Sequence, residues 1–217
     1  MNKRAIFDMD GTIIDSMPKW GTVLEDYFQS LGIVFDDNYK KTLIGLSMDD
    51  ILKNVNRDFG LKEDPSQSFN NILEIMRDGY LNEFDLKPGV LNCLDILKSK
   101  GIRMAVATAT PEHIALDALK ANNLLEYFEF VQTCDNIGHL KSDPIFWKKA
   151  SQKLESDISN SVVFEDALYC IQTVNSLNGN IVAIYDVTSS HDKNCIKSLS
   201  NQFLCHYDEL DYDIFLK

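Results

Sequence analysis

The chain lacks most of the features that mark membrane, secreted or nucleic-acid-binding proteins. Its 217 residues contain no apolar stretch near the ~20 residues that a membrane-spanning helix needs, and no signal-peptide h-region. Basic residues are outnumbered, with 21 Lys and Arg against 33 Asp and Glu, which gives a formal net charge of -12. Such a charge disfavours nucleic acid and anionic membranes as partners. We therefore expect a cytoplasmic protein that binds neither nucleic acid nor membrane.

Cysteine and histidine are scarce and scattered. The five cysteines are odd in number and form no C-x-x-C pair, which favours reduced, buried thiols over a disulfide framework. The four histidines are isolated and show no metal-ligand spacing, so we assign them no role.

What is present indicates an ordinary globular chain, with 45% hydrophobic and 25% charged residues. Residues 3–8 predict a strand. Apolar residues then recur at helical spacing to residue 86, first on one face between Trp20 and Leu31 and then over 51–59. A third helix begins at Asp64 and Pro65, with Gln67 as the capping-box partner of Asp64.

From residue 87 onward, apolar strands alternate with amphipathic helices, which is typical of a parallel sheet covered on both faces. The predicted fold class is therefore α/β: a doubly wound (Rossmann-like) parallel sheet core with an inserted all-helical domain. We assign residues 1–14 and 87–217 to the core, and residues 15–86 to the insertion. No exposed apolar stripe calls for a dimer, so we expect a monomer.

The chain is organised around Asp8-Met9-Asp10-Gly11-Thr12, directly after the first strand. Residues i and i+2 of an extended chain point to the same side, so Asp8 and Asp10 can face a common point. Two carboxylates this close repel each other unless a cation lies between them, and Mg²⁺ is the natural partner of oxygen ligands. The pattern favours a metal-dependent phosphoryl-transfer site with Asp8 as nucleophile. The alternative is a strand end with a polar Asx turn.

Other polar residues follow later strands, and ligands of parallel sheets bind beyond the carboxyl ends of the strands. Thr108 and Ala109 follow the strand at 104–107 and precede Pro111, which suits an anion site at a helix start. Glu165 and Asp166 follow the strand at 161–164, and Lys141 precedes a helix predicted over 143–155. We expect these groups to converge on one edge of the sheet.

These motifs resemble those of the haloacid dehalogenase-like hydrolase superfamily. The order Asp8-x-Asp10, Thr108, Lys141, Glu165-Asp166 is similar to that of the subgroup with a helical cap, which includes β-phosphoglucomutase and phosphoglycolate phosphatase. The resemblance implies a small phosphorylated metabolite as substrate and Mg²⁺ as cofactor.

The resemblance and the chemistry of the residues give the same roles. Asp8 would form an aspartyl-phosphate, and Asp10 would act as general acid and base. Thr108 and the Ala109 N–H would hold phosphate oxygens, and Lys141 would neutralise charge. The resemblance implies a metal site made by Asp8, the Asp10 backbone carbonyl and Asp166, with Glu165 as an outer-shell or alternative ligand.

Substrate choice should lie in the cap, which is the inserted helical domain. By resemblance, Ser47 and Met48 lie on the loop that contacts substrate. The mutase carries an arginine where this chain has Met48, and a thioether cannot hold a phosphate. The mutase also tends to have valine where Thr12 stands. Of the first linker, Ser16, Lys19 and Trp20 could reach the site, although for Trp20 we favour a packing role.

The leading hypothesis is thus a Mg²⁺-dependent phosphatase. A hexose-phosphate mutase is the alternative enzyme. A receiver-like phospho-Asp signalling domain and an inactive binding protein are alternatives of other classes.

Overall fold

Six parallel strands form the centre of the fold, in the order β3-β2-β1-β4-β5-β6. The computed structural model describes residues 4–43 and 48–215. The strands are β1 (Arg4–Phe7), β2 (Arg103–Thr108), β3 (Val131–Thr133), β4 (Ser161–Glu165), β5 (Asn180–Ile184) and β6 (Gln202–Leu204). β1 pairs with β2 on one side and β4 on the other, which places the first strand in the middle of the sheet. The predicted doubly wound α/β core is confirmed.

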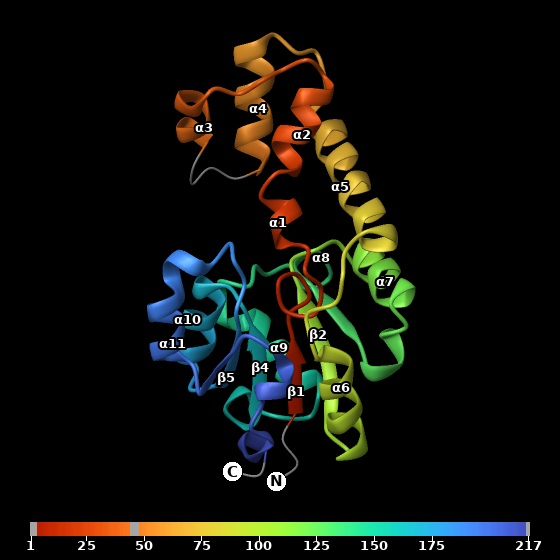
Figure 1. Ribbon diagram of the computed structural model, residues 1–217, viewed down its shortest axis with the longest axis vertical. Helices are drawn as coiled ribbons and strands as arrows, with labels where there is room; N and C mark the ends of the chain where they lie inside the picture. Colours follow the sequence, from red (N-terminus) through yellow and green to blue (C-terminus); the bar gives the residue numbers. More distant parts are fainter. Residues whose placement is uncertain (1–3, 44–47, 216–217) are drawn as a thin grey trace.

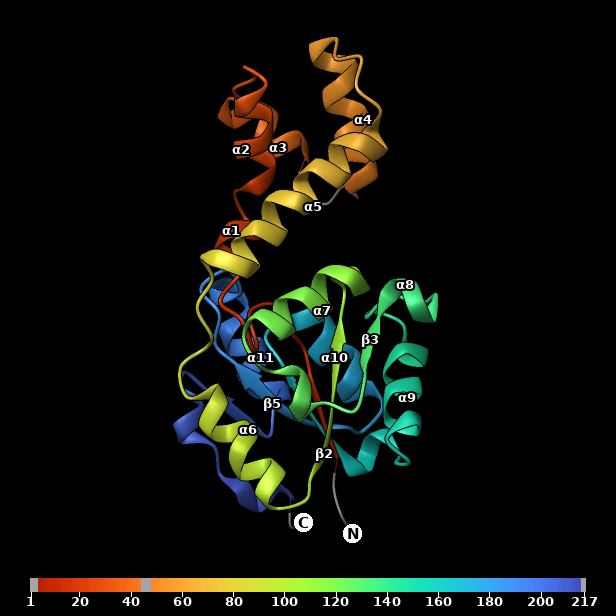
Figure 2. The same cartoon turned by 90° about the vertical axis from the view of Figure 1, so that its right-hand side faces the viewer.

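The alternation of side chains along β1 explains the helical layers on both sides of the sheet (Figure 2). Ala5 and Phe7 pack on the face covered by α6 (Val90–Ser99) and α7 (Glu112–Ala121). Ile6 points to the other face, covered by α9 (Pro144–Lys153), α10 (Leu168–Ser176) and α11 (Lys193–Leu199).

Short helical turns complete the core. They are η1 (Leu125–Tyr127), α8 (Cys134–Ile137), η2 (Ile158–Asn160), η3 (Ser190–Asp192), η4 (Tyr207–Glu209) and η5 (Tyr212–Phe215). The last two of these turns lie near the C-terminus, and their Tyr207 and Phe215 side chains are buried in the core.

Between β1 and α6, the described residues form five helices, which stand over the end of the sheet where β1 terminates (Figure 1). They are α1 (Met17–Trp20), α2 (Val23–Ser30), α3 (Asp37–Leu43), α4 (Met48–Phe59) and α5 (Pro65–Asn82). The entering and leaving segments run side by side, because Ile14 and Leu86 form an antiparallel bridge. The boundaries predicted at residues 14/15 and 86/87 stay a prediction about which part folds as a unit.

Two local expectations were wrong, and two short helices, α3 and α8, were not predicted. The single helix between Trp20 and Leu31 is broken into α1 and α2 at Gly21 and Thr22, which are weak helix formers. At the start of α5 the Asp64 carboxylate accepts from the Ser66 N–H, as an N-cap should, but the Gln67 amide donates to Asn71 instead of closing a capping box.

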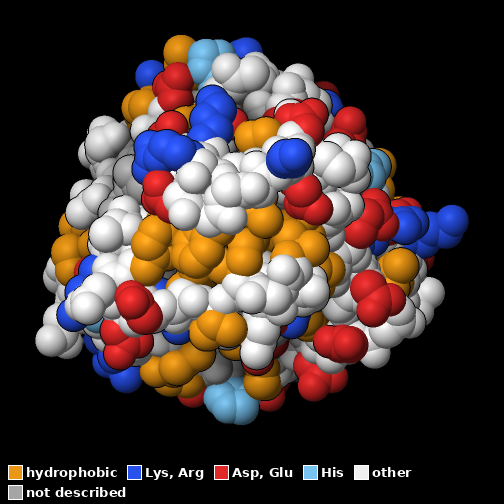
Figure 3. Space-filling view, turned by 90° about the horizontal axis from the view of Figure 1, so that it is seen from above, with side chains coloured by type: hydrophobic (Ala, Val, Ile, Leu, Met, Phe, Trp, Pro, Cys, Tyr) orange, Lys and Arg blue, Asp and Glu red, His pale blue; other side chains and the backbone are white. Residues whose placement is uncertain are grey.

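The surface of the cap end shows hydrophobic side chains gathered across the middle of the face, between polar groups (Figure 3). The described part of the cap has four exposed large apolar side chains, Leu31, Val34, Phe59 and Leu81. None of the helices in the described ranges combines the length and apolarity that crossing a bilayer requires.

Candidate active site

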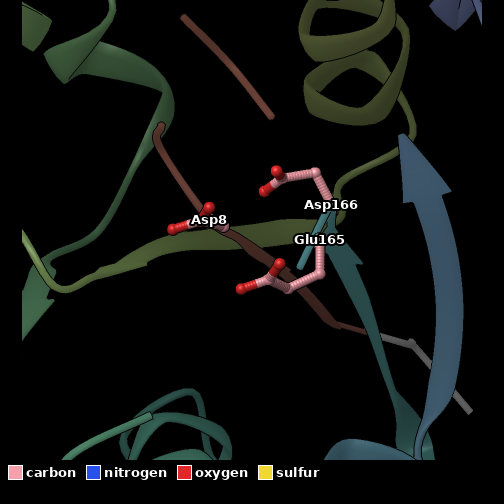
Figure 4. A group of neighbouring side chains, drawn as sticks. All are labelled: Asp8, Glu165 and Asp166. Carbon is pink, nitrogen blue, oxygen red and sulfur yellow. The ribbon is translucent and has the colours of Figure 1, made fainter. Parts of the chain in front are cut away.

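Three buried carboxylates meet where β1 and β4 end (Figure 4). Asp8 follows β1, while Glu165 ends β4 and Asp166 follows it. The two strands are neighbours, and the Asp8 N–H donates to the Phe164 carbonyl at 3.0 Å. One oxygen from each of the three carboxylates lies within 4.8 Å of the others. The sheet register therefore brings together acids that are more than 150 residues apart in the sequence.

Lys141 is the cation of this cluster. Its ammonium donates to Asp8 Oδ1 at 2.6 Å and to Glu165 Oε1, and its side chain is 4% exposed. Its backbone carbonyl accepts from the Trp147 indole N–H at 2.8 Å, which fixes the segment before α9. Burial alone would lower the pKa of Lys141, but the charge of Asp8 and its other neighbours holds that pKa well above the usual value. The lysine is thus charged.

One lysine does not balance three acids. Burial raises the pKa of Asp8 to about 8; Lys141 opposes this, and the charges of Glu165 and Asp10 add to it. Burial also raises the pKa of Asp166 well above its usual range, helped by the charges of Glu165 and Asp8. The cluster therefore favours an additional positive charge over three ionised carboxylates alone.

The donor set fits a hard divalent cation. Asp166 Oδ2 is buried and, among the described residues, has no hydrogen-bond partner, whereas Oδ1 accepts from the Thr12 hydroxyl at 3.4 Å. Gly11 keeps the space beside that oxygen open: a Cβ there would lie 2.6 Å from Asp166 Oδ2, and its φ of +75° also favours glycine. Both Glu165 oxygens already accept hydrogen bonds, from Lys141 and from the Ala167 N–H at 2.6 Å. Asp8 and Asp166 are therefore freer than Glu165 to bind an ion directly.

Asp10 is held by hydroxyl and indole donors from the cap side. Its Oδ1 accepts from Ser16 Oγ at 2.6 Å, from the Trp20 indole at 3.3 Å and from the Tyr80 hydroxyl. The same indole donates to the Tyr80 oxygen at 3.0 Å. Burial, with the charge of Asp10, raises the pKa of Tyr80 well above its usual value, so Tyr80 remains a donor. Trp20 packs against the hydrophobic core, as expected, and its indole nitrogen also reaches the site.

Asp10 also contacts the core. Its Oδ2 accepts from Thr110 Oγ1 at 2.7 Å and, more weakly, from Thr108 Oγ1 at 3.4 Å. Thr108 is buried at the end of β2 and accepts from the Thr110 N–H, while Ala109 is exposed at the cavity between them. Thr110 and Tyr80 were not among the residues singled out from the sequence. Thr110 could have been found, because it follows a strand end.

The other cap residues lie elsewhere. Lys19 donates to Asp26 at 2.6 Å and so forms an ion pair within the cap. Met48 begins α4 and lines a second cavity of about 360 Å³, between α4 and α5, instead of the one at the acids. Ser47 lies outside the described residues, and the substrate-binding roles of Ser47 and Met48 stay predictions.

A cavity of about 450 Å³ opens over the acids. Its core side includes Asp8, Asp10, Lys141, Glu165 and Asp166. The cap side is formed by Met17, Trp20, Phe69 and Leu73. The catalytic candidates of the core therefore face the cap across this cavity.

The fold and the site together define a class: a parallel α/β protein with an acidic, cation-fitting centre beneath a helical insertion. The chain belongs to the haloacid dehalogenase-like hydrolase family, whose sequence profile matches residues 5–184.

Relatives and solved structures agree with this membership. A phosphorylated carbohydrates phosphatase from Thermotoga maritima is 26% identical over 85% of this chain and 85% of its own. Hexitol phosphatase B from Escherichia coli K12 is 29% identical over 76% and 75% of the two chains. The crystal structure of a family IA, variant 3 hydrolase from Entamoeba histolytica superposes with a TM-score of 0.81 over 99% and 97% of the chains, at 19% identity, and shows the shared fold.

Proposed function

We propose that the protein is a Mg²⁺-dependent phosphatase that hydrolyses a small phosphomonoester through an aspartyl-phosphate. The observation that carries this proposal is the pairing of Asp8 with Lys141 opposite Asp166 Oδ2, which has no hydrogen-bond partner among the described residues, at the floor of a cavity. The names of the relatives support the substrate class, since one is a phosphorylated carbohydrates phosphatase and another a hexitol phosphatase.

The first half-reaction uses Asp8 and Asp10. A carboxylate oxygen of Asp8 attacks phosphorus while the bond to the leaving oxygen breaks, and Asp10 gives that oxygen its proton. The second half-reaction reverses the role of Asp10, which takes a proton from the water that attacks the phosphorus. The Asp8–phosphorus bond breaks, and inorganic phosphate leaves with the Asp8 carboxylate restored.

The remaining residues position groups and offset charge. Thr108 and the Ala109 N–H hold phosphoryl oxygens, and Lys141 offsets the charge that Asp8 and the phosphoryl group bring together. Glu165 holds the lysine in place. Asp8, Asp166 and the backbone carbonyl of Asp10 would hold Mg²⁺, which supplies positive charge to the phosphoryl oxygens when bound.

The receiver-like domain and the mutase are the alternatives to a phosphatase. The family match leaves the receiver-like signalling hypothesis without support. A mutase differs in its product, and Thr12 and Met48 favour hydrolysis over it. With a hexose phosphate, we expect release of free phosphate and no accumulation of an isomer.

The test is hydrolysis of p-nitrophenyl phosphate with Mg²⁺. We expect Asp8→Asn and Asp10→Asn each to abolish turnover while circular dichroism stays unchanged. Asp157→Asn, an exposed acid that does not line the cavity, is the matched control and should retain activity. Excess EDTA should silence the wild type, and added Mg²⁺ should restore it. Full activity in Asp8→Asn, or turnover that survives EDTA, contradicts the proposal.

A further inference from the structure

The cavity over the acids has two chemically different sides. Its core side carries the acids and Lys141, but the four cap residues that line it, Met17, Trp20, Phe69 and Leu73, offer carbon atoms almost alone. We propose that the substrate is the monophosphate of an uncharged alcohol that turns a C–H or aromatic face toward the cap, with no second anionic group. This inference rests on the proposed phosphatase activity and names its substrate class.

Charge is the first reason. Lys141 is the sole cation among the described residues that line the cavity, and Asp8 and Glu165 already occupy it. The exposed carboxylate of Asp135 also lines the cavity. A carboxylate or second phosphate on the leaving group would thus meet an acid and no free cation. Moving such a charge out of water without a partner is costly.

Nearby cap cations are turned to other partners. Lys19 lies between Met17 and Trp20 in sequence, yet its ammonium pairs with Asp26 within the cap. Arg77, one turn beyond Leu73 on α5, donates to Asp117 of α7 at 2.8 Å. Lys19 is therefore paired within the cap, Arg77 joins the cap to α7 of the core, and neither lines the cavity.

The apolar wall is the second reason. Phe69 and Leu73 are four residues apart and share one face of α5. Trp20 has a single polar atom, and that nitrogen already donates to Asp10 and Tyr80. A hydroxyl pressed against this wall would lose water without gaining a protein partner, whereas a C–H group gains from burial.

The experiment compares three-carbon esters that differ in hydroxyl groups and in charge: propyl phosphate, glycerol 3-phosphate and 3-phosphoglycerate, each with Mg²⁺. We expect kcat/KM to fall in that order, by about threefold or more at the first step and about 100-fold or more from the first ester to the last. Equal values, or a preference for 3-phosphoglycerate, overturn the inference. If p-nitrophenyl phosphate is hydrolysed while the order fails, the proposed phosphatase stands without this substrate class. No turnover of any ester overturns both.

A variant tests the wall directly. Phe69 is half-buried, so Phe69→Arg can place a cation at the cap side. We expect the ratio of kcat/KM for 3-phosphoglycerate to that for propyl phosphate to rise about tenfold or more. Phe69→Gln, which adds polarity without charge, should not raise it. Met17→Lys places a cation at another half-buried position of the wall, and the same ratio can be measured in it if Phe69→Arg fails to fold. An unchanged ratio in the folded cation variants contradicts the inference.

Discussion

Replacing Asp8 by asparagine should abolish activity and, in the absence of metal, make the protein more stable. Asp8 is buried beside Glu165 and Asp166 with only Lys141 to balance them. Asparagine has nearly the same shape as a protonated aspartate but carries no charge, so it removes the repulsion without leaving a cavity. In the metal-free protein, the negative charge of the proposed nucleophile would therefore lower the stability of the fold.

The magnitude follows from the pKa of Asp8, which burial and its acidic neighbours raise from 3.8 to about 8. The folded protein therefore keeps a proton on Asp8 between about pH 4 and pH 8, where the unfolded chain has lost it. The native state binds the extra proton, so wild-type stability declines as the pH rises through this window. The free energy of unfolding of the wild type falls by about 1.4 kcal/mol per pH unit. At pH 8 this loss, measured against Asp8→Asn, amounts to on the order of 5 kcal/mol.

The assay is urea unfolding in EDTA at several pH values from 5 to 8, for the wild type and Asp8→Asn. The stability gap between them should widen steadily as the pH increases and narrow again when Mg²⁺ is added, since a ligand of the native state stabilises it. Asp135→Asn, an exposed acid at the same cavity, should show no widening gap. A gap between the wild type and Asp8→Asn that is flat from pH 5 to pH 8 would refute the reasoning.

Two further predictions concern other buried contacts. Lys87→Met should lower the free energy of unfolding by about 3–5 kcal/mol in urea melts, because it leaves the fully buried Asp186 carboxylate without its ion partner at 2.7 Å. Lys98→Met removes an exposed ion pair and should change the free energy of unfolding by under about 1 kcal/mol. Equal losses in the two variants would argue against a special contribution of the buried pair. Tyr80→Phe should lower kcat/KM about tenfold or more on propyl phosphate, since it removes a hydrogen bond that positions Asp10, the proposed general acid, but less on p-nitrophenyl phosphate, whose leaving group needs little protonation. Equal losses on both esters would indicate a general structural effect.

The sequence predicted the core better than the cap. Buried strands such as Met104–Ala107 are short apolar runs between glycine and polar residues, and their order implied a parallel sheet whose carboxyl ends gather polar groups. The convergence of Asp8, Lys141 and Asp166 followed from that geometry without any knowledge of side-chain contacts.

The contacts of Asp10 could not be predicted in the same way. Tyr80 lies 70 residues away and belongs to an apolar helix face, so its pattern indicates packing and not a hydrogen bond. Trp20 was likewise expected to pack, because an indole on a helix face is apolar except for one nitrogen. Such roles depend on how the insertion sits on the core, which periodicity does not encode.

The bridge between Ile14 and Leu86 has a consequence for how the chain folds. β1 must find β2 across the 95 residues between Phe7 and Arg103, a long loop to close before these two strands pair. Once α1–α5 have folded and hold residues 14 and 86 together, the effective loop shrinks to roughly a quarter, which lowers its closure entropy by about 1 kcal/mol. The segment that covers the finished site can thereby hasten the pairing of the strands that build it.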